Sequence, residues 1–148
     1  MAGLFLVSDA EEAGLGLSMG AQDLPLVIQD RNFDASNQFE YLVGRGGEGG
    51  SMGWMMGRRI GGGMGSMMAG MKGVLGRQIL VNGRLESSLE VGRRAHRLRL
   101  LNGSNIRTLK LAWSDGRPLS VIGTDGGLLA APVQRHYVML APADRIEL

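Results

Sequence analysis

The spacing of seven methionines is the feature of this sequence that points most directly to chemistry. They form two groups with helical spacing, Met52, Met55 and Met56, and Met64, Met67, Met68 and Met71. If these segments coil into helix, each group lies on one face. Thioether sulfur is a soft, neutral donor that favours Cu(I) over harder ions, so the pattern predicts Cu(I) binding. The alternative is that flexible methionine side chains fill an apolar contact or line a loop.

The residue types that are scarce in the chain exclude several other kinds of site. The sequence has no cysteine, which removes disulfides, thiolate nucleophiles, iron–sulfur clusters and Cys-rich zinc sites. Its two histidines, His96 and His136, are too few for a three-histidine metal centre. No Gly-Lys dipeptide is present for a phosphate-binding loop, and no serine has the spacing of a hydrolase nucleophile. We therefore assign no catalytic residue.

Arginine is concentrated at one place, where Arg93, Arg94, Arg97 and Arg99 could form a phosphate-binding patch. Two of these arginines, Arg97 and Arg99, alternate with leucines. A simpler interpretation is therefore a half-buried strand whose solvated face is basic. Aromatic side chains that could stack on bases are missing near these arginines, so we expect no nucleic-acid partner.

The elements on either side of the methionines must position them. The 148 residues of the chain are enough for one domain. The chain opens with an apolar run at Gly3–Val7. Ser8 and Glu11 fit a capping box, which predicts a short helix through about Leu15. Strands are expected at 26–29 and 39–42, separated by a turn rich in Asp and Asn.

Residues 44–76 form a Gly/Met-rich insert between the two parts of the domain. Fourteen of these 33 residues are glycine. Ordering so much glycine costs more conformational entropy than the side chains can return. We therefore expect a long flexible loop that carries all seven methionines of the two groups.

The last part of the chain, residues 77–148, has the pattern of an all-β fold. Short alternating runs that predict strands occur at 78–81, 95–101, 108–114, 119–124, 137–140 and 145–148. Turn dipeptides suited to positive φ separate them, at Asn82-Gly83, Asn102-Gly103, Asp115-Gly116 and Asp125-Gly126. Many short strands with turns at this spacing predict a β-sandwich or barrel.

Several stretches of the sequence resemble the middle cupredoxin domain of bacterial multicopper oxidases. In chain order they are DLPLVIQDR at 23–31, RLRLLNGSN at 97–105, SDGRPL at 114–119, TDGGLL at 124–129 and LAPADR at 140–145. The resemblance is closest to the laccase, bilirubin-oxidase and copper-efflux oxidase group, some members of which carry Met-rich inserts that bind copper. It implies an all-β, cupredoxin-like Greek-key sandwich or barrel.

For the parent family, the resemblance implies a three-domain enzyme that oxidises phenols, bilirubin or Cu(I) and reduces dioxygen to water at copper centres. The copper ligands belong to the flanking domains, and neither His96 nor His136 matches a ligand position. Residues 1–7 look like the closing strand of a preceding domain, and residues 8–148 look like the copper-free middle domain. The expected partners are the flanking copper-bearing cupredoxin domains. An exposed strand at Gly3–Val7 is also expected to promote self-association.

These observations predict a structural middle domain of a multicopper oxidase that is inactive on its own and carries a candidate Cu(I) site in its insert. The alternative is a free-standing copper-handling module that uses the insert to capture Cu(I). No apolar stretch has the length of a membrane span. The first residues lack the basic start and the length of a signal peptide, so no secretory address is expected, although the parent family is mostly periplasmic or secreted.

Overall fold

The structure is a computed structural model that describes residues 3–40, 75–85 and 88–148. Strands dominate these ranges, which confirms the all-β prediction. The elements are, in chain order, α1 (Ala10–Gly14), the 3-10 helix η1 (Gly20–Gln22), β1 (Asp23–Arg31), β2 (Gln78–Val81), β3 (Arg97–Asn102), β4 (Leu109–Leu111), β5 (Leu119–Thr124), β6 (Gly127–Arg135), β7 (Val138–Leu140) and β8 (Arg145–Glu147). Within the described ranges no helix is long and apolar enough to span a membrane.

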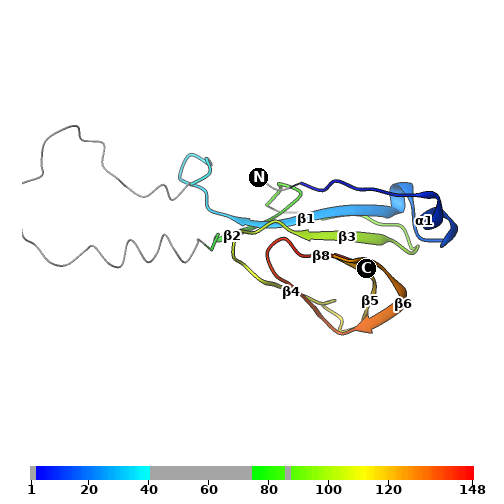
Figure 1. Cartoon of the computed structure of the whole chain (residues 1–148). Helices are drawn as coiled ribbons and strands as arrows, with labels where there is room; N and C mark the ends of the chain where they lie inside the picture. The colour runs from blue at the N-terminus through cyan, green and yellow to red at the C-terminus, as the bar shows by residue number, and fades with distance from the viewer. Residues whose placement is uncertain (1–2, 41–74, 86–87) are drawn as a thin grey trace, which may run out of the picture.

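The strands form two sheets. Six of them make one mixed sheet in the order β2-β1-β3-β8-β5-β6, and β4 pairs with β7 in a second, smaller sheet. β1 and β3 run parallel, with Asp23 opposite Arg97 and Leu26 opposite Leu100, whereas the other pairs are antiparallel. Figure 1 shows β1, β3 and β8 side by side, with β4, β5 and β6 on one side of them and α1 near the ends of β1 and β3 at the right of the view. This arrangement is the predicted cupredoxin-like sandwich.

The hydrophobic core lies between the two sheets. Its buried members come from β3, β4, β5 and β7, and they are Leu100, Leu109, Leu119, Val121, Val138 and Leu140. Along β5 the buried residues alternate with more exposed ones, which is the period of two that the sequence shows. Each of these leucines and valines contributes about 1.5–3 kcal/mol when it is fully buried. The core therefore fixes which face of β3 points inward and which points away.

Asn-Gly turns behave differently at their two places in the chain. Asn82 and Gly83 both have positive φ, at 50° and 79°, as the turn prediction requires. Asn102 instead ends β3 with no exposed surface, and the prediction of a positive-φ turn there is wrong. Its Nδ2 donates to the carbonyl oxygens of Arg107 and Leu140, at 2.7 and 2.9 Å. Because an aspartate could not make these two donations, the position needs an amide.

The strand predictions hold best where strands are half-buried. β2 and β5 match their predicted limits, and β4 is shorter than predicted. β6 was not predicted at all, because most of its nine residues are exposed and it shows no clear alternation. Phe39 forms an isolated bridge with Phe33, Glu40 belongs to no strand, and residues 41 and 42 of the predicted strand lie outside the described residues.

The helix predicted near the N-terminus exists, but its first cap is a different residue. Asp9, not Ser8, is the N-cap of α1, because the Asp9 Oδ1 accepts a hydrogen bond from the Glu12 amide at 2.8 Å. The predicted capping box through Ser8 and Glu11 is therefore wrong by one residue. This shift places Glu12, in the middle of the short helix, where it can reach the sheet.

Candidate functional site: a buried ionic cluster

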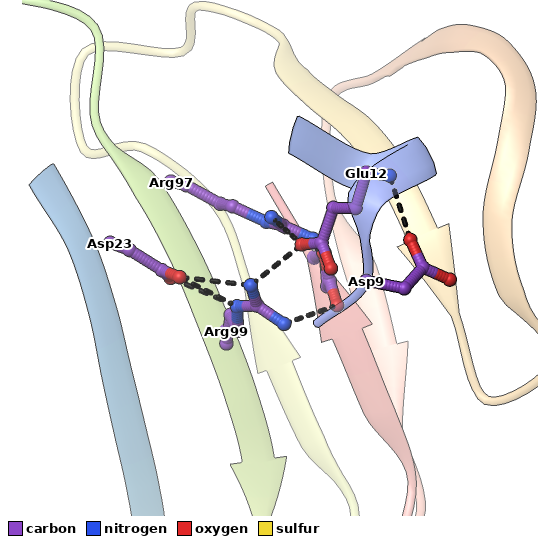
Figure 2. A network of polar contacts seen from close by, with 6 residues as sticks. Asp9, Glu12, Asp23, Arg97 and Arg99 are labelled. Carbon is purple, nitrogen blue, oxygen red and sulfur yellow. Dashed lines mark hydrogen bonds and ion pairs between the residues drawn. The ribbon is translucent and has the colours of Figure 1, made fainter. Parts of the chain in front are cut away.

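Two arginines on the outer face of β3 meet three carboxylates from other parts of the chain. Arg97 and Arg99 point away from the core because side chains alternate along a strand. The sheet register brings Asp23 of β1 opposite Arg97 and Glu147 of β8 opposite Arg99. Glu12 comes from α1, and Figure 2 shows its side chain reaching toward both guanidinium groups. We call these five residues the ionic cluster.

Every carboxylate of the ionic cluster accepts hydrogen bonds from a guanidinium group. Glu12 Oε1 accepts from Arg97 Nη1, and from Arg99 Nη2 at 2.8 Å. Both oxygens of Asp23 accept from Arg99 Nε, at 2.9 and 3.0 Å. Glu147 Oε2 accepts from Arg97 Nε at 2.8 Å and also from Arg97 Nη2. The ionic cluster thus joins α1 to three neighbouring strands.

The prediction of a solvated basic face on β3 is wrong. The side chain of Arg97 is 2% exposed and that of Arg99 is 10% exposed. An isolated buried charge is very unfavourable, so these arginines require the carboxylates that surround them. The hydrogen bond to Asp23 raises the pKa of Arg99 above its ordinary value. With three carboxylates against two guanidinium groups, the ionic cluster does not offer a free cationic surface to phosphate.

A second set of buried polar contacts lies where β1 ends and the chain returns to start β2. The Asp30 side chain is 1% exposed, and its Oδ2 accepts from the Gly76 amide at 2.6 Å and from Arg107 Nε at 2.9 Å. Arg107 Nη2 donates in turn to the Gly76 carbonyl oxygen at 2.6 Å. We call Asp30, Gly76 and Arg107 the stem clasp. The sequence pattern did not indicate it, because Asp30 stands between Gln29 and Arg31, after the apolar part of β1, where a polar residue is ordinary.

The charge state of Asp30 follows from two opposing effects. Burial alone raises the pKa of a carboxyl group, but the hydrogen bonds from Arg107 and Gly76 outweigh it. The pKa of Asp30 is therefore held below its ordinary value of 3.8. A carboxyl group with a lowered pKa stabilises the fold above its unfolded pKa, and this contribution is lost as the pH falls through the folded pKa.

An Asp30→Asn variant is expected to lose about 1.5–3 kcal/mol of unfolding free energy near neutral pH, since it loses a charged hydrogen-bond partner. The gap between wild type and variant should shrink as the pH falls below the ordinary carboxyl pKa of 3.8, because the unfolded wild type then binds a proton that folded Asp30 takes up only at lower pH. Urea unfolding of both proteins between about pH 7 and pH 3 measures this gap. Asp115→Asn, at an exposed ion pair with Arg117, is the matched control. A gap that stays constant over the whole pH range would contradict the role given to the Asp30 charge.

The seven methionines predicted to bind Cu(I) all lie outside the described residues. These are Met52, Met55, Met56, Met64, Met67, Met68 and Met71. Within the described ranges, no group of three or more His, Cys, Asp or Glu side chains could hold a metal ion. His96 Nε2 contacts the Gly92 carbonyl oxygen at 3.1 Å, and His136 is exposed between β6 and β7. The residues described here therefore do not fit a copper centre.

The apolar run at Gly3–Val7 forms neither helix nor strand in this chain. Phe5 is 92% exposed and Val7 is 71% exposed. A groove of about 490 Å³ lies between this segment and β3 and β8, with Leu101 and Ile146 among its lining residues. The interpretation of Gly3–Val7 as a closing strand of a preceding domain stays a prediction, as does self-association through it.

Comparison with known proteins finds relatives that match nearly the whole chain. No family model matches it. Among curated sequences, the cell division protein FtsP of Edwardsiella tarda is 38% identical over 149 residues, which are 99% of this chain and 26% of that protein. FtsP of Escherichia coli K12 is 37% identical over 100% of this chain and 27% of that protein. The chain thus spans about a quarter of the length of these relatives.

Several solved structures with a similar fold are multicopper oxidases. A multicopper oxidase from Pediococcus acidilactici has a TM-score of 0.72 and 32% identity, over 95% of this chain and 25% of that protein. The laccase-like multicopper oxidase CueO from Ochrobactrum sp. has a TM-score of 0.71 and 28% identity, over 95% of this chain and 27% of that protein. These similarities confirm the resemblance found in the sequence motifs. The chain is a cupredoxin-like domain of the kind that bacterial multicopper oxidases contain.

Proposed function

We propose that the chain is the copper-free middle domain of a multicopper-oxidase-like protein, with a structural role. The observation that carries this proposal is similarity over nearly the full chain to proteins about four times as long. The residues described here also support it, because their buried charged groups are used in internal ion pairs. The ionic cluster holds β1, β3 and β8 in register and fixes α1 on them.

The curated relatives suggest the process in which the parent protein acts. They are named cell division protein FtsP, so we propose that the parent of this chain serves cell division as an FtsP-like protein. In that setting this domain holds the flanking domains in position and performs no oxidation itself. The flanking cupredoxin domains are then its partners within one polypeptide.

A domain exchange tests this proposal. The corresponding segment of Escherichia coli FtsP is replaced by this chain, and the chimaera is produced in cells that lack their own FtsP. Cell-length distributions are measured under a condition in which the deletion lengthens the cells. Restoration of wild-type length supports the proposal, whereas a soluble, folded chimaera that restores nothing contradicts it. Turnover of a phenolic substrate by the pure 148-residue chain would contradict a purely structural role.

A second role, Cu(I) capture by the insert, is supported by the spacing of the methionines. Soft thioethers favour Cu(I) over Cu(II) or Zn(II). Ordering a glycine-rich segment costs about 1–2 kcal/mol per fixed residue, which opposes tight binding. We therefore expect weak, exchangeable binding at more than one stoichiometry, suited to capture or delivery of copper.

Anaerobic competition with a Cu(I) chelator measures this binding. The wild-type chain is compared with a variant in which all seven methionines of the insert are changed to leucine, which keeps apolar volume and removes sulfur. The wild type should retain Cu(I) that the variant releases. Equal retention by the two proteins would assign the methionines to apolar contacts instead.

A further inference from the structure

The chain contains two Asn-Gly dipeptides, Asn82-Gly83 and Asn102-Gly103, and the fold gives them opposite surroundings. Asparagine followed by glycine is prone to spontaneous deamidation, because glycine has no side chain to hinder attack by its own backbone nitrogen. That nitrogen bonds to the asparagine Cγ, the Cγ–Nδ2 bond breaks, and ammonia leaves. Water then opens the resulting cyclic imide, which gives aspartate or isoaspartate. The reaction needs a free glycine nitrogen and an asparagine side chain that can turn toward it.

The folded chain blocks both requirements at Asn102. The Asn102 residue has no exposed surface, and its Nδ2 donates to two main-chain carbonyl oxygens. Its Oδ1 accepts from the Ser104 amide at 3.0 Å. The Gly103 nitrogen donates to the Ile28 carbonyl oxygen at 2.7 Å, so the attacking atom is also held. Reaction at Asn102 therefore requires the end of β3 to unfold.

The surroundings of Asn82 meet the first requirement. Asn82 and Gly83 are exposed and form the turn after β2, with the Arg84 amide donating to the Val81 carbonyl oxygen at 3.0 Å. Among the residues that the structure describes, none accepts a hydrogen bond from the Gly83 amide. The attacking nitrogen is thus open to solvent in the folded chain.

The Asn82 side chain is held by two hydrogen bonds to the edge of β1. Its Oδ1 accepts from the Val27 amide at 2.8 Å, and its Nδ2 donates to the Pro25 carbonyl oxygen at 3.0 Å. Both hydrogen bonds are exposed, so water competes for them. Their rupture frees the side chain while the core stays packed. They should therefore slow the reaction at Asn82 by only about tenfold to a hundredfold.

We propose that Asn82 is a deamidation site of the folded chain, whereas Asn102 is modified only after unfolding. The modification also changes how β2 is held. An aspartate at position 82 has no donor for the Pro25 carbonyl oxygen and places a negative charge beside it. An isoaspartate lengthens the main chain within the tight turn. Because β2 is the edge strand of the six-stranded sheet, deamidation at Asn82 loosens β2 from β1.

Peptide mapping of the 148-residue chain tests the choice of site. The chain is incubated at alkaline pH, folded or unfolded in urea, and then digested with trypsin, which places the two dipeptides in peptides 78–84 and 100–107. Mass spectrometry detects the replacement of –NH2 by –OH, and fragmentation locates it. In urea both sites should react at similar rates.

In the folded chain, Asn82 should react at least about tenfold faster than Asn102, because a folded domain is unfolded for about a thousandth of the time or less. Equal rates at the two sites in the folded chain would overturn the proposal. So would an intact Asn82 in folded chain that is incubated until both sites have reacted in urea.

Hydrogen exchange of the modified chain tests the structural consequence. Ion-exchange chromatography separates the deamidated chain by its added negative charge, and peptide mapping confirms that the change is at Asn82. The β2 amides of this fraction should exchange about tenfold faster than those of the unmodified fraction from the same incubation, which is the matched control. The β5 amides should keep their rates. Unchanged β2 exchange, or equal acceleration in β2 and β5, would show that the Asn82 amide does not hold β2 on β1.

Discussion

An Arg97→Ala variant should lose about 3–5 kcal/mol of unfolding free energy, the range found when one partner of a buried ion pair is removed. The Arg97 side chain is 2% exposed and accounts for hydrogen bonds to both Glu12 and Glu147. After truncation Glu147 keeps only Arg99, whose Nη1 lies 3.6 Å from Glu147 Oε1. Glu147 is then left poorly paired and Glu12 keeps only Arg99, both where water has little access, which destabilises the folded state.

Urea unfolding followed by circular dichroism measures this loss, and absence of a cooperative transition would be its extreme form. Arg117→Ala is the matched control, because Arg117 is 70% exposed and pairs only with the exposed Asp115. Exposed ion pairs contribute about 0–1 kcal/mol, so the control should unfold near the wild-type midpoint. Equal midpoints for Arg97→Ala and wild type would contradict the structural role of the ionic cluster.

Alternation along the sequence was sufficient to predict where most strands lie. In β5 the buried Leu119 and Val121 follow a period of two, and both ends of the strand were found. The sequence pattern did not predict β6, because its residues are mostly exposed on an edge of the sheet, where no buried face imposes alternation. Alternation predicts a strand only where one face of that strand is buried in the core.

Local pattern could not reveal the ionic cluster. Arg97 and Arg99 occupy the positions that alternation assigns to the solvated face, and that assignment placed them in water. Their partner Glu12 is 85 residues away from Arg97 in the chain, and Glu147 is 50 residues away. The correct side of the strand was therefore predictable, but what covers that side depends on tertiary contacts.

The position of the methionines shows a further limit. Their spacing predicts a soft metal site, but all seven lie outside the described residues. What the structure does describe is how the segment that carries them begins and ends. β1 leads into it and β2 follows it, with Arg31 paired to Gln78 at the point where the two strands meet. The stem clasp lies at this point, so it ties the insert to the core whatever the insert binds.

Gly76 lies too close to the backbone of β1 to be replaced by a residue with a side chain. A Cβ atom added there would lie 2.2 Å from the Arg31 amide nitrogen and 2.5 Å from the Asp30 carbonyl carbon. Both atoms belong to the backbone of β1, so relief requires the two strands of the stem to move apart. Such movement would also lengthen the hydrogen bond between the Gly76 amide and Asp30, which is 2.6 Å long in the folded chain.

A Gly76→Ala variant is therefore expected to lose about 3 kcal/mol of unfolding free energy, by combining an overpacked contact with a weakened hydrogen bond to a buried charge. Urea unfolding gives the loss, and hydrogen exchange of β1 and β2 amides should show where it arises. Gly92→Ala is the matched control, because a Cβ there meets no atom within 4 Å. If the two alanine variants were equally stable, the close approach of Gly76 to β1 would not constrain the stem. If only Gly76→Ala is destabilised, and its hydrogen exchange is accelerated most at the β1 and β2 amides next to Gly76, the stem clasp anchors the insert as the geometry requires.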